Sequence, residues 1–197
     1  ITGWRANDRD YVRIARLGPH ACLALYAIGQ PPDLSLPDAE LKVQFDAIKA
    51  AGGTPEHPNI YTSSKVTAHG VAYGMTAHGL ASNFPDRFPT VKAADRLVQL
   101  FYNQMAPRIR DYHRHQRLLA HKQHYLGGME HPYRYKHWFW SVLAYKPITE
   151  KQRQWRIKRN RLCVEINGRW FAVDRGEDSK RVIAFYPQST AAGVLKR

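Results

Sequence analysis

The sequence predicts an α+β fold: a mainly helical body of about five helices, followed by a small three-stranded antiparallel meander at the C-terminus. Apolar residues recur at helical spacing over 38–51 and 90–104, which indicates amphipathic helices. An Asn-Gly pair at 167–168 separates two short alternating segments, which is typical of a β-hairpin. With 197 residues, 44% of them hydrophobic, the chain is long enough to bury a core.

Residues 1–106 are expected to form the helical body. A short helix over 8–17 ends at a Gly-Pro break, and the apolar run 21–28 that follows is expected to be buried. Asp38 is expected to cap a helix over 38–51, which a Gly-Gly pair ends. One face of that helix carries Leu41, Phe45 and Ile48.

Prolines interrupt the region 54–89, so it is predicted to be the least regular part of the body. It contains Thr-Ala-His-Gly twice, at 67–70 and 76–79, without a longer repeat around the copies. Thr90 is expected to cap the helix over 90–104 that follows. The apolar side of that helix is expected to carry Val91, Ala94, Leu97, Val98 and Phe101.

The region 107–161 is predicted to be helical, aromatic and strongly basic. A helix over 107–125 begins at a proline, and an aromatic-basic block over 131–145 follows it. Thr149 and Gln152 form a capping box, which predicts a further helix to about residue 160.

The region 162–197 is predicted to hold the β-meander and a tail, in one compact unit with the rest of the chain. Its strands are expected at 162–166, 169–173 and 181–186, the first two joined by a type I′ turn.

Most of the formal net charge of +14 lies in about a quarter of the chain. Residues 107–161 carry 14 basic and 3 acidic side chains, whereas 1–106 are nearly balanced. Because such a concentrated field repels itself, it predicts an anionic partner, with phosphate on RNA favoured and lipid headgroups or acidic protein subunits as alternatives.

Two predicted helices supply most of these cations. On the helix over 107–125 an arginine stripe is placed to lie against a phosphate backbone. On 150–161 the cations spread around the whole helix, and a helix that is polar all round rarely packs against a core. The expected phosphate-binding side chains are Arg108, Arg110, Arg114, Arg117, Lys122, Arg134, Lys136, Lys151, Arg153, Arg156, Lys158, Arg159 and Arg161.

Aromatic side chains alternate with cations between these helices. Such rings stack on exposed bases, lie in a membrane interface or simply belong to the core, and the sequence leaves all three possibilities open. The expected stacking or interface residues are Tyr133, Tyr135, Trp138, Trp140 and Trp155.

Catalytic motifs are scarce. The sequence has no phosphate-binding glycine loop, no zinc-protease motif and no nucleophile elbow, and its two cysteines, Cys22 and Cys163, are too few for a zinc cluster. No metal and no cofactor is therefore expected. A metal-independent nuclease stays open as a minor alternative, with candidates His113, His115, His121, Tyr112 and Arg117.

These observations predict a non-catalytic structural component of a large hetero-oligomeric organellar assembly, most concretely a mitochondrial ribosomal protein that binds rRNA phosphates through 107–161. The alternative is an accessory subunit of a mitochondrial inner-membrane respiratory or ATP synthase complex, and further alternatives are the nuclease or a viral RNA-packaging protein. Since the chain begins with Ile1 rather than Met, a cleaved organellar presequence is expected, with a trimmed chain or a fragment of a longer chain as the alternative. The longest apolar runs are too short to span a bilayer, so a soluble or peripheral protein is expected.

Overall fold

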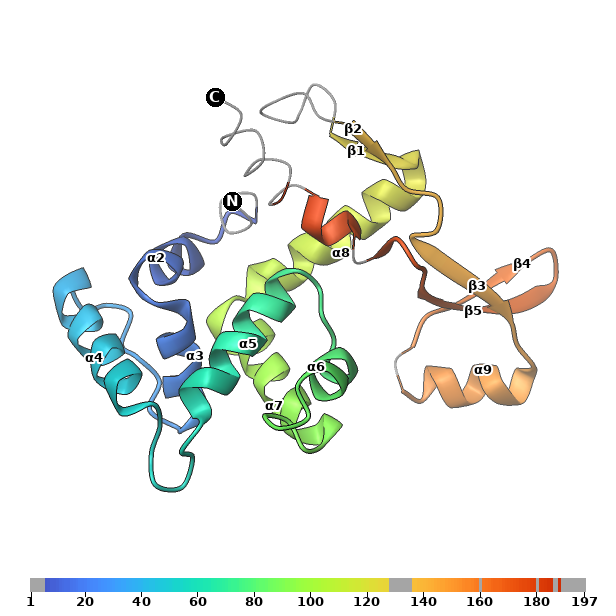
Figure 1. Cartoon of the computed structure of the whole chain (residues 1–197). Coiled ribbons are helices and arrows are strands. Elements are labelled where there is room, and N and C mark those ends of the chain that lie inside the picture. Colours follow the sequence, from blue (N-terminus) through green and yellow to red (C-terminus); the bar gives the residue numbers. More distant parts are fainter. Residues whose placement is uncertain (1–5, 128–135, 160, 180, 186–187, 189–197) are drawn as a thin grey trace. The chain divides into compact units, whose positions relative to one another are not determined.

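A computed structural model describes residues 6–127, 136–159, 161–179, 181–185 and 188 (Figure 1). Contacts divide the chain into an N-terminal unit, residues 1–113, and a C-terminal unit, residues 114–197. Mixed helix and sheet confirm the predicted α+β composition, but the described residues form more helices than the five or so expected.

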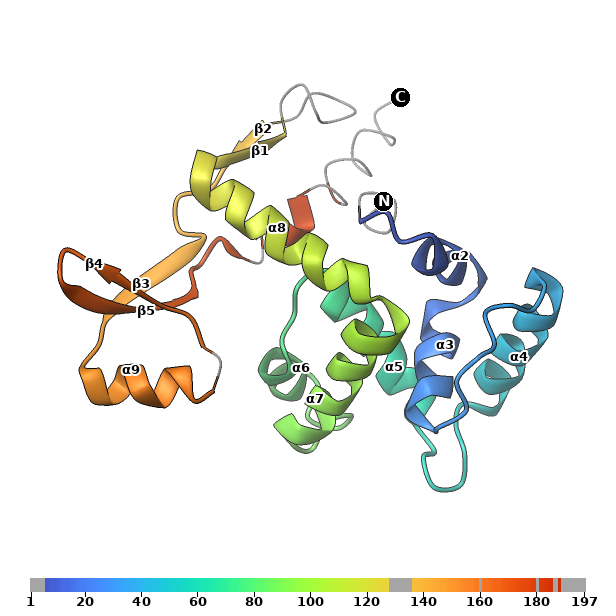
Figure 2. The ribbon, with the colours of Figure 1, turned by 180° about the vertical axis from the view of Figure 1, so that it is seen from behind.

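The N-terminal unit is helical. Its elements are α2 (Arg9–Leu17), α3 (Pro19–Ala27), α4 (Asp38–Ala51), α5 (Ile60–Ala72), α6 (Ala77–Asn83), α7 (Val91–Leu100), the π-helix η1 (Phe101–Met105) and the first part of α8 (Pro107–Gln123). Figures 1 and 2 show α3 between α4 and α5, seen from opposite sides. This helix is the predicted apolar run, and it is buried all round because nearly every one of its side chains is apolar.

Local signals set the ends of the first helices. Asp8 caps α2 by accepting a hydrogen bond from the Tyr11 N–H at 2.9 Å. The expected cap at Asp38 is wrong, because Pro37 occupies that position and the Asp38 carboxylate instead accepts a bond from Arg13 Nε at 2.6 Å. Gly52 ends α4 in the left-handed conformation, as predicted, with φ of 71°. Leu41, Phe45 and Ile48 form its buried face.

The region 54–89 is more regular than predicted. All of its prolines lie outside α5 and α6, so the proline-free stretch between Pro58 and Pro85 is long enough for both helices. The two Thr-Ala-His-Gly copies differ in structure, since the first lies within α5 and the second starts α6. Thr76 Oγ1 caps α6 by accepting a bond from the Gly79 N–H at 3.2 Å.

The helix predicted over 90–104 is present as α7 followed by η1. Thr90 caps it as predicted, accepting a bond from the Ala93 N–H at 3.1 Å. Its apolar face is buried with the exception of Val91, which is 38% exposed in the first turn. Pro107 then begins α8, as predicted. That helix ends at Gln123 rather than residue 125, because His124 takes a positive φ of 60°.

The C-terminal unit combines two small sheets with the second part of α8, helix α9 (Glu150–Ile157) and a short helical segment at 181–185. Strands β1 (Tyr125–Gly127) and β2 (Lys136–Trp138) pair antiparallel, a hairpin that the sequence did not predict. Strands β3 (Leu143–Pro147), β4 (Cys163–Ile166) and β5 (Arg169–Arg175) form a second sheet with β5 in the middle. Helix α9 connects β3 to β4 and begins at the predicted capping box of Thr149 and Gln152.

The three-stranded sheet is antiparallel as predicted, but one of its strands was misplaced. The hairpin turn is confirmed as type I′ by positive φ at both Asn167 and Gly168. The expected strand over 181–186 is wrong, because residues 181–185 are helical and both edges of β5 already pair with β3 and β4. Val182 and Ile183 are neighbours and both fully buried, a pattern that a half-buried strand does not allow.

Candidate nucleic-acid interface

The net charge is divided unequally between the two units. Residues 114–197 carry 18 Lys and Arg against 6 Asp and Glu, whereas residues 1–113 carry 12 against 10. The C-terminal unit therefore holds +12 of the formal charge of +14. Any anionic partner that this field attracts is expected to bind there.

Three of the six carboxylates in the C-terminal unit are already bonded inside it. Glu150 pairs with Arg153 at 2.7 Å, Asp174 with Arg156 at 2.8 Å, and Asp178 with Arg181 at 3.3 Å. Among the described residues of this unit, these cations are exposed and have no ion pair: Arg114, Lys122, Lys136, Lys146, Lys151, Lys158, Arg159, Arg161, Arg169 and Arg175.

The arginine stripe expected on α8 is only partly available. Arg108 donates to the Asn7 carbonyl, and Arg110 donates to the Asn103 side chain and lies 5.6 Å from the centre of the Tyr102 ring. These two arginines are thus held against the N-terminal unit. Arg114 and Lys122 are exposed, and Arg117 is half-buried. Leu118 is also exposed, so the outward face of α8 mixes cations with leucine.

Helix α9 packs against the sheet through arginine. Arg156 is 8% exposed and donates to Asp174 Oδ1, to the Leu162 carbonyl at 3.3 Å and to the Val173 carbonyl at 3.2 Å. The hydrogen bond with Asp174 raises the pKa of Arg156, and the same bond lowers the pKa of Asp174. Arg153 lies 3.9 Å from the centre of the Trp170 ring.

The expectation that this helix lacks a packing face is therefore wrong. Guanidinium groups pack because they stack flat on an indole ring and form several directed hydrogen bonds at once. The side chains of Arg153 and Arg156 consequently stabilise the fold through these ion pairs, and we no longer expect them to bind phosphate.

The remaining cations of α9 and its C-terminal end face solvent. Lys151 and Lys158 are exposed, while Arg159 and Arg161 lie 4.1 and 5.4 Å from the centre of the Trp155 ring. Trp155 is 45% exposed, so this predicted interface residue lies at the surface. An open groove of about 400 Å³ beside it is lined by Ile148, Lys151, Gln152, Trp155 and Arg156.

A second group of aromatic rings stands on the β1–β2 hairpin and the segment that follows it. We call it the tryptophan face, and it consists of His124, Tyr125, Lys136, Trp138 and Trp140. The two indole rings are stacked, with centroids 5.8 Å apart and planes within 7° of parallel. Trp138 is 49% exposed and Trp140 is 72% exposed, so neither is a core residue. The Lys136 ammonium lies 3.9 Å from the centre of the Tyr125 ring and 4.4 Å from that of Trp138.

Strand register explains how these side chains come together. Tyr125 pairs with Trp138, which places both on one side of the hairpin, and Leu126 on the other side is fully buried. The next residue, Phe139, is buried in a small core with Ala120, Val142 and Val182.

A carboxylate fixes the backbone at the exposed ring. Asp178 Oδ2 accepts hydrogen bonds from the N–H groups of Trp140 at 3.0 Å and Ser141 at 3.1 Å. The bonds from Ser141 and Trp140, together with Arg181, lower the pKa of Asp178. The Trp140 backbone is therefore anchored while its ring remains in water.

Three predicted interface residues, Tyr133, Arg134 and Tyr135, lie outside the described residues. Sequence reasoning missed His124 and Tyr125 as parts of the site, because the hairpin that exposes them was not predicted. The sequence did indicate the site through the alternation of cations with aromatic residues over 133–140.

The histidines considered for a nuclease are not gathered at one exposed place. His113 and Tyr112 are buried, and His113 Nδ1 lies 3.0 Å from the Tyr102 hydroxyl. His121 Nε2 lies 2.8 Å from the Tyr145 hydroxyl, and both of these residues belong to the C-terminal unit. Among the described residues, no three His, Cys, Asp or Glu side chains stand close enough together to hold a metal ion.

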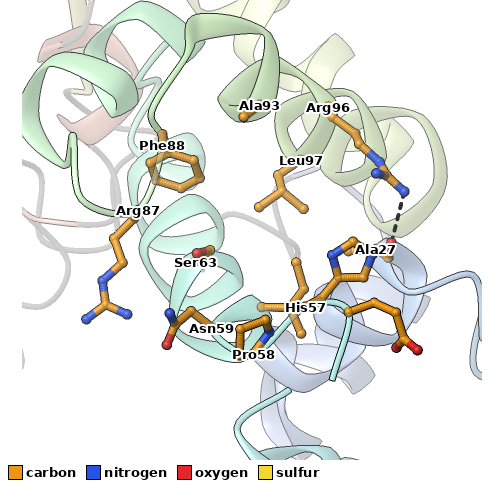
Figure 3. A pocket seen from close by; sticks show the side chains of 12 residues that line it. Ala27, His57, Pro58, Asn59, Ser63, Arg87, Phe88, Ala93, Arg96 and Leu97 are labelled. Atoms are coloured by element: carbon orange, nitrogen blue, oxygen red, sulfur yellow. Dashed lines mark hydrogen bonds between the residues drawn. The ribbon is translucent and has the colours of Figure 1, made fainter. Parts of the chain in front are cut away.

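The N-terminal unit has a pocket of about 310 Å³ beside the start of α5 and α7. Figure 3 shows Arg87 and Arg96 on opposite sides of it, with Phe88 and Leu97 between them. Arg96 already donates to the Ala27 carbonyl at 3.1 Å, and Glu56 adds a negative charge. This pocket therefore has a weaker positive character than the C-terminal surface.

No helix in the described part of the chain combines the length and apolar character that crossing a bilayer requires. No protein-family model matches this chain, nor does any curated protein or solved structure. Functional inference therefore depends on the surface of the C-terminal unit.

Proposed function

We propose that this protein is a non-catalytic RNA-binding component of a large ribonucleoprotein assembly, most concretely a mitochondrial ribosomal protein. One observation carries the proposal: the C-terminal unit has a formal charge of +12, and its exposed cations outnumber the carboxylates left to pair with them. The cations expected to contact phosphate are Arg114, Lys122, Lys136, Lys151, Lys158, Arg159 and Arg161.

Phosphate polymers suit this surface physically. A chain that neutralises several phosphates releases condensed counterions, so its affinity falls steeply with salt. The surface cations come from α8, β2 and α9 rather than from one helix, as expected for a folded polymer that contacts several elements.

A pair of matched triple variants tests the proposal. Replacing Lys122, Lys151 and Lys158 by Ala removes three exposed cations from the C-terminal unit. The matched control replaces Lys49, Lys65 and Lys92, which are also exposed but lie in the N-terminal unit. Binding of the full chain to a structured RNA is measured by filter retention between about 50 and 200 mM salt.

We expect the C-terminal variant to lose about 2–3 from the slope of log affinity against log salt, since each phosphate contact contributes about 0.7 with a single strand and about 0.9 with a DNA duplex. The N-terminal control is expected to keep the wild-type slope. Equal slopes for the two variants would refute the proposal, as would RNA binding too weak to measure at the lower salt concentration.

Membership of a mitochondrial membrane complex is the second candidate, and the exposed Trp138 and Trp140 favour it. The two candidates separate when the native particle is sedimented in a gradient. Release by RNase supports the ribonucleoprotein assembly. Resistance to RNase together with collapse in detergent supports the membrane complex.

A further inference from the structure

We infer that the tryptophan face binds unpaired bases, so that the C-terminal unit holds single-stranded stretches of RNA rather than duplex alone. This inference rests on the proposed function and names the kind of RNA. It is carried by the stacked and exposed pair Trp138 and Trp140 beside the Lys136 ammonium.

The exposure of Trp140 is costly unless a partner covers the ring. A large aromatic side chain gains free energy when it leaves water, and this ring is 72% exposed. The Trp140 backbone N–H, however, donates a hydrogen bond to the Asp178 carboxylate, which keeps this residue from moving into the core. The site therefore holds an apolar plane in water at a fixed position.

The geometry of the pair resembles that of stacked bases. The two indole planes are within 7° of parallel, and His124 stacks on Trp140 with its centroid 5.5 Å away. A base that joins this stack meets a flat aromatic surface, and stacking of this kind accepts every base. Lys136 brings a positive charge beside the rings, where the adjacent phosphate of a bound strand would lie.

The backbone under the tryptophan face is held in place by hydrogen bonds, which favours binding. The hairpin register fixes Trp138 opposite Tyr125, and the two bonds to Asp178 fix the segment 140–141. Because the backbone under the rings is already ordered, binding a base costs less conformational entropy than it would on a loop without these bonds.

A lipid bilayer is the competing occupant, and it fits less well. Membrane insertion requires an apolar surface wider than two rings. In the described part of the hairpin the aliphatic Leu126 is fully buried, as is Phe139 just beyond it, while Lys136 and His137 are exposed. The rings thus stand among polar groups, as a base-stacking site requires.

Duplex RNA cannot use this platform, because its bases are already stacked inside the helix. The discriminating comparison therefore uses three probes: a short oligoadenylate, the same strand paired with oligouridylate, and an abasic sugar-phosphate strand of equal length. The abasic strand keeps the phosphates and removes the bases. All three are titrated against the full chain by fluorescence anisotropy.

We expect Trp140→Ala to weaken oligoadenylate binding about tenfold and to leave binding of the duplex and abasic strands unchanged, since only an unpaired base stacks on this ring. Trp140→Phe keeps an aromatic plane and is expected to restore most of the preference for oligoadenylate over the abasic strand. Near-ultraviolet circular dichroism of the other aromatic residues checks that each variant is folded.

The experiment distinguishes failure of the base-stacking inference from failure of the proposed function. If wild-type protein binds the oligoadenylate and abasic strands equally, the stacking inference is overturned while the proposed function stands. If none of the RNA probes binds, the proposed function fails. If vesicles of phosphatidylcholine and cardiolipin bind the wild type and Trp140→Ala releases them, with no effect on RNA, the face is a membrane site and the inference is again overturned.

Discussion

At the scale of single residues, Arg156 shows how a cation in a basic segment becomes part of the fold. Its side chain reaches the central strand of the sheet and satisfies two carbonyl oxygens besides the Asp174 carboxylate. A truncated side chain would leave these acceptors and a partly buried carboxylate without a donor, which costs more than a surface ion pair is worth.

We therefore expect Arg156→Ala to lower the free energy of unfolding of the C-terminal unit by about 2 kcal/mol. Urea unfolding followed by tryptophan fluorescence measures this change, since four of the five tryptophans lie in that unit. Lys158→Ala removes an exposed cation two positions away and is expected to change stability by less than about 0.5 kcal/mol.

The pH dependence of that difference identifies its origin. Because Arg156 lowers the pKa of Asp174 in the folded state, the stabilisation is fully present above the unfolded pKa of about 3.9. It is lost as the pH falls through the lower folded value. The gap between wild type and Arg156→Ala should thus be constant near neutral pH and shrink in acid, and a gap independent of pH would contradict the ion-pair account.

At the scale of secondary-structure elements, helix α9 depends on its cap more than an apolar helix does. Its first turn is closed reciprocally: Thr149 Oγ1 accepts a bond from the Gln152 N–H, and Gln152 Oε1 accepts one from the Thr149 N–H. The helix is only eight residues long, and its apolar Trp155 and Ile157 are half exposed. Little burial is left to compensate for a lost cap.

Thr149→Ala is expected to destabilise the C-terminal unit by about 1 kcal/mol, the usual contribution of an N-cap side chain. Thr149→Ser keeps the accepting hydroxyl and should retain most of that stability. The loss is measured by thermal unfolding of both variants under one set of conditions. Equal stability of Thr149→Ala and Thr149→Ser would show that the capping box contributes nothing.

Elements with local signals were predicted well from the sequence. Thr90 and Thr149 cap helices where they were expected, and the Asn-Gly turn sets its hairpin, although the cap expected at Asp38 was misplaced by one residue. These signals work because each cap or turn satisfies backbone groups only a few residues away.

Elements that depend on distant pairing were predicted poorly. Strand β3 takes the edge of β5 that was assigned to 181–186, and the sequence near either segment does not record that choice. The β1–β2 hairpin was not predicted either, since its strands are only three residues long and so carry too short a pattern to recognise. At the candidate site, the cation-aromatic alternation predicted Trp138 and Trp140 as stacking or interface residues, and both rings are exposed. Composition alone could not separate the buried Arg156 from the exposed Lys158.

At the scale of the whole molecule, the charge imbalance predicts that the two units respond differently to ionic strength. The C-terminal unit has a formal charge of +12 and the N-terminal unit has +2. Like charges in one small unit repel one another and oppose its compact state, and salt screens that repulsion.

Each unit has its own reporter of unfolding. Tryptophan fluorescence follows the C-terminal unit, which holds Trp138, Trp140, Trp155 and Trp170. Cys22 is fully buried in the N-terminal unit, and burial raises its pKa to about 12, so its thiol reacts only after that unit opens. A Cys163→Ser variant leaves Cys22 as the single cysteine of the chain.

Raising the salt from about 0.01 to 0.1 M shortens the Debye length from about 30 to 10 Å, which screens charges across the C-terminal unit. We expect the midpoint of the tryptophan transition to rise by about 4–8 °C, the shift that about 1 kcal/mol produces in a unit of this size. The temperature at which an uncharged thiol reagent labels Cys22 should stay nearly constant. Equal shifts for both reporters would mean that the units unfold together, and a constant tryptophan midpoint would mean that the cations are spaced too widely to repel.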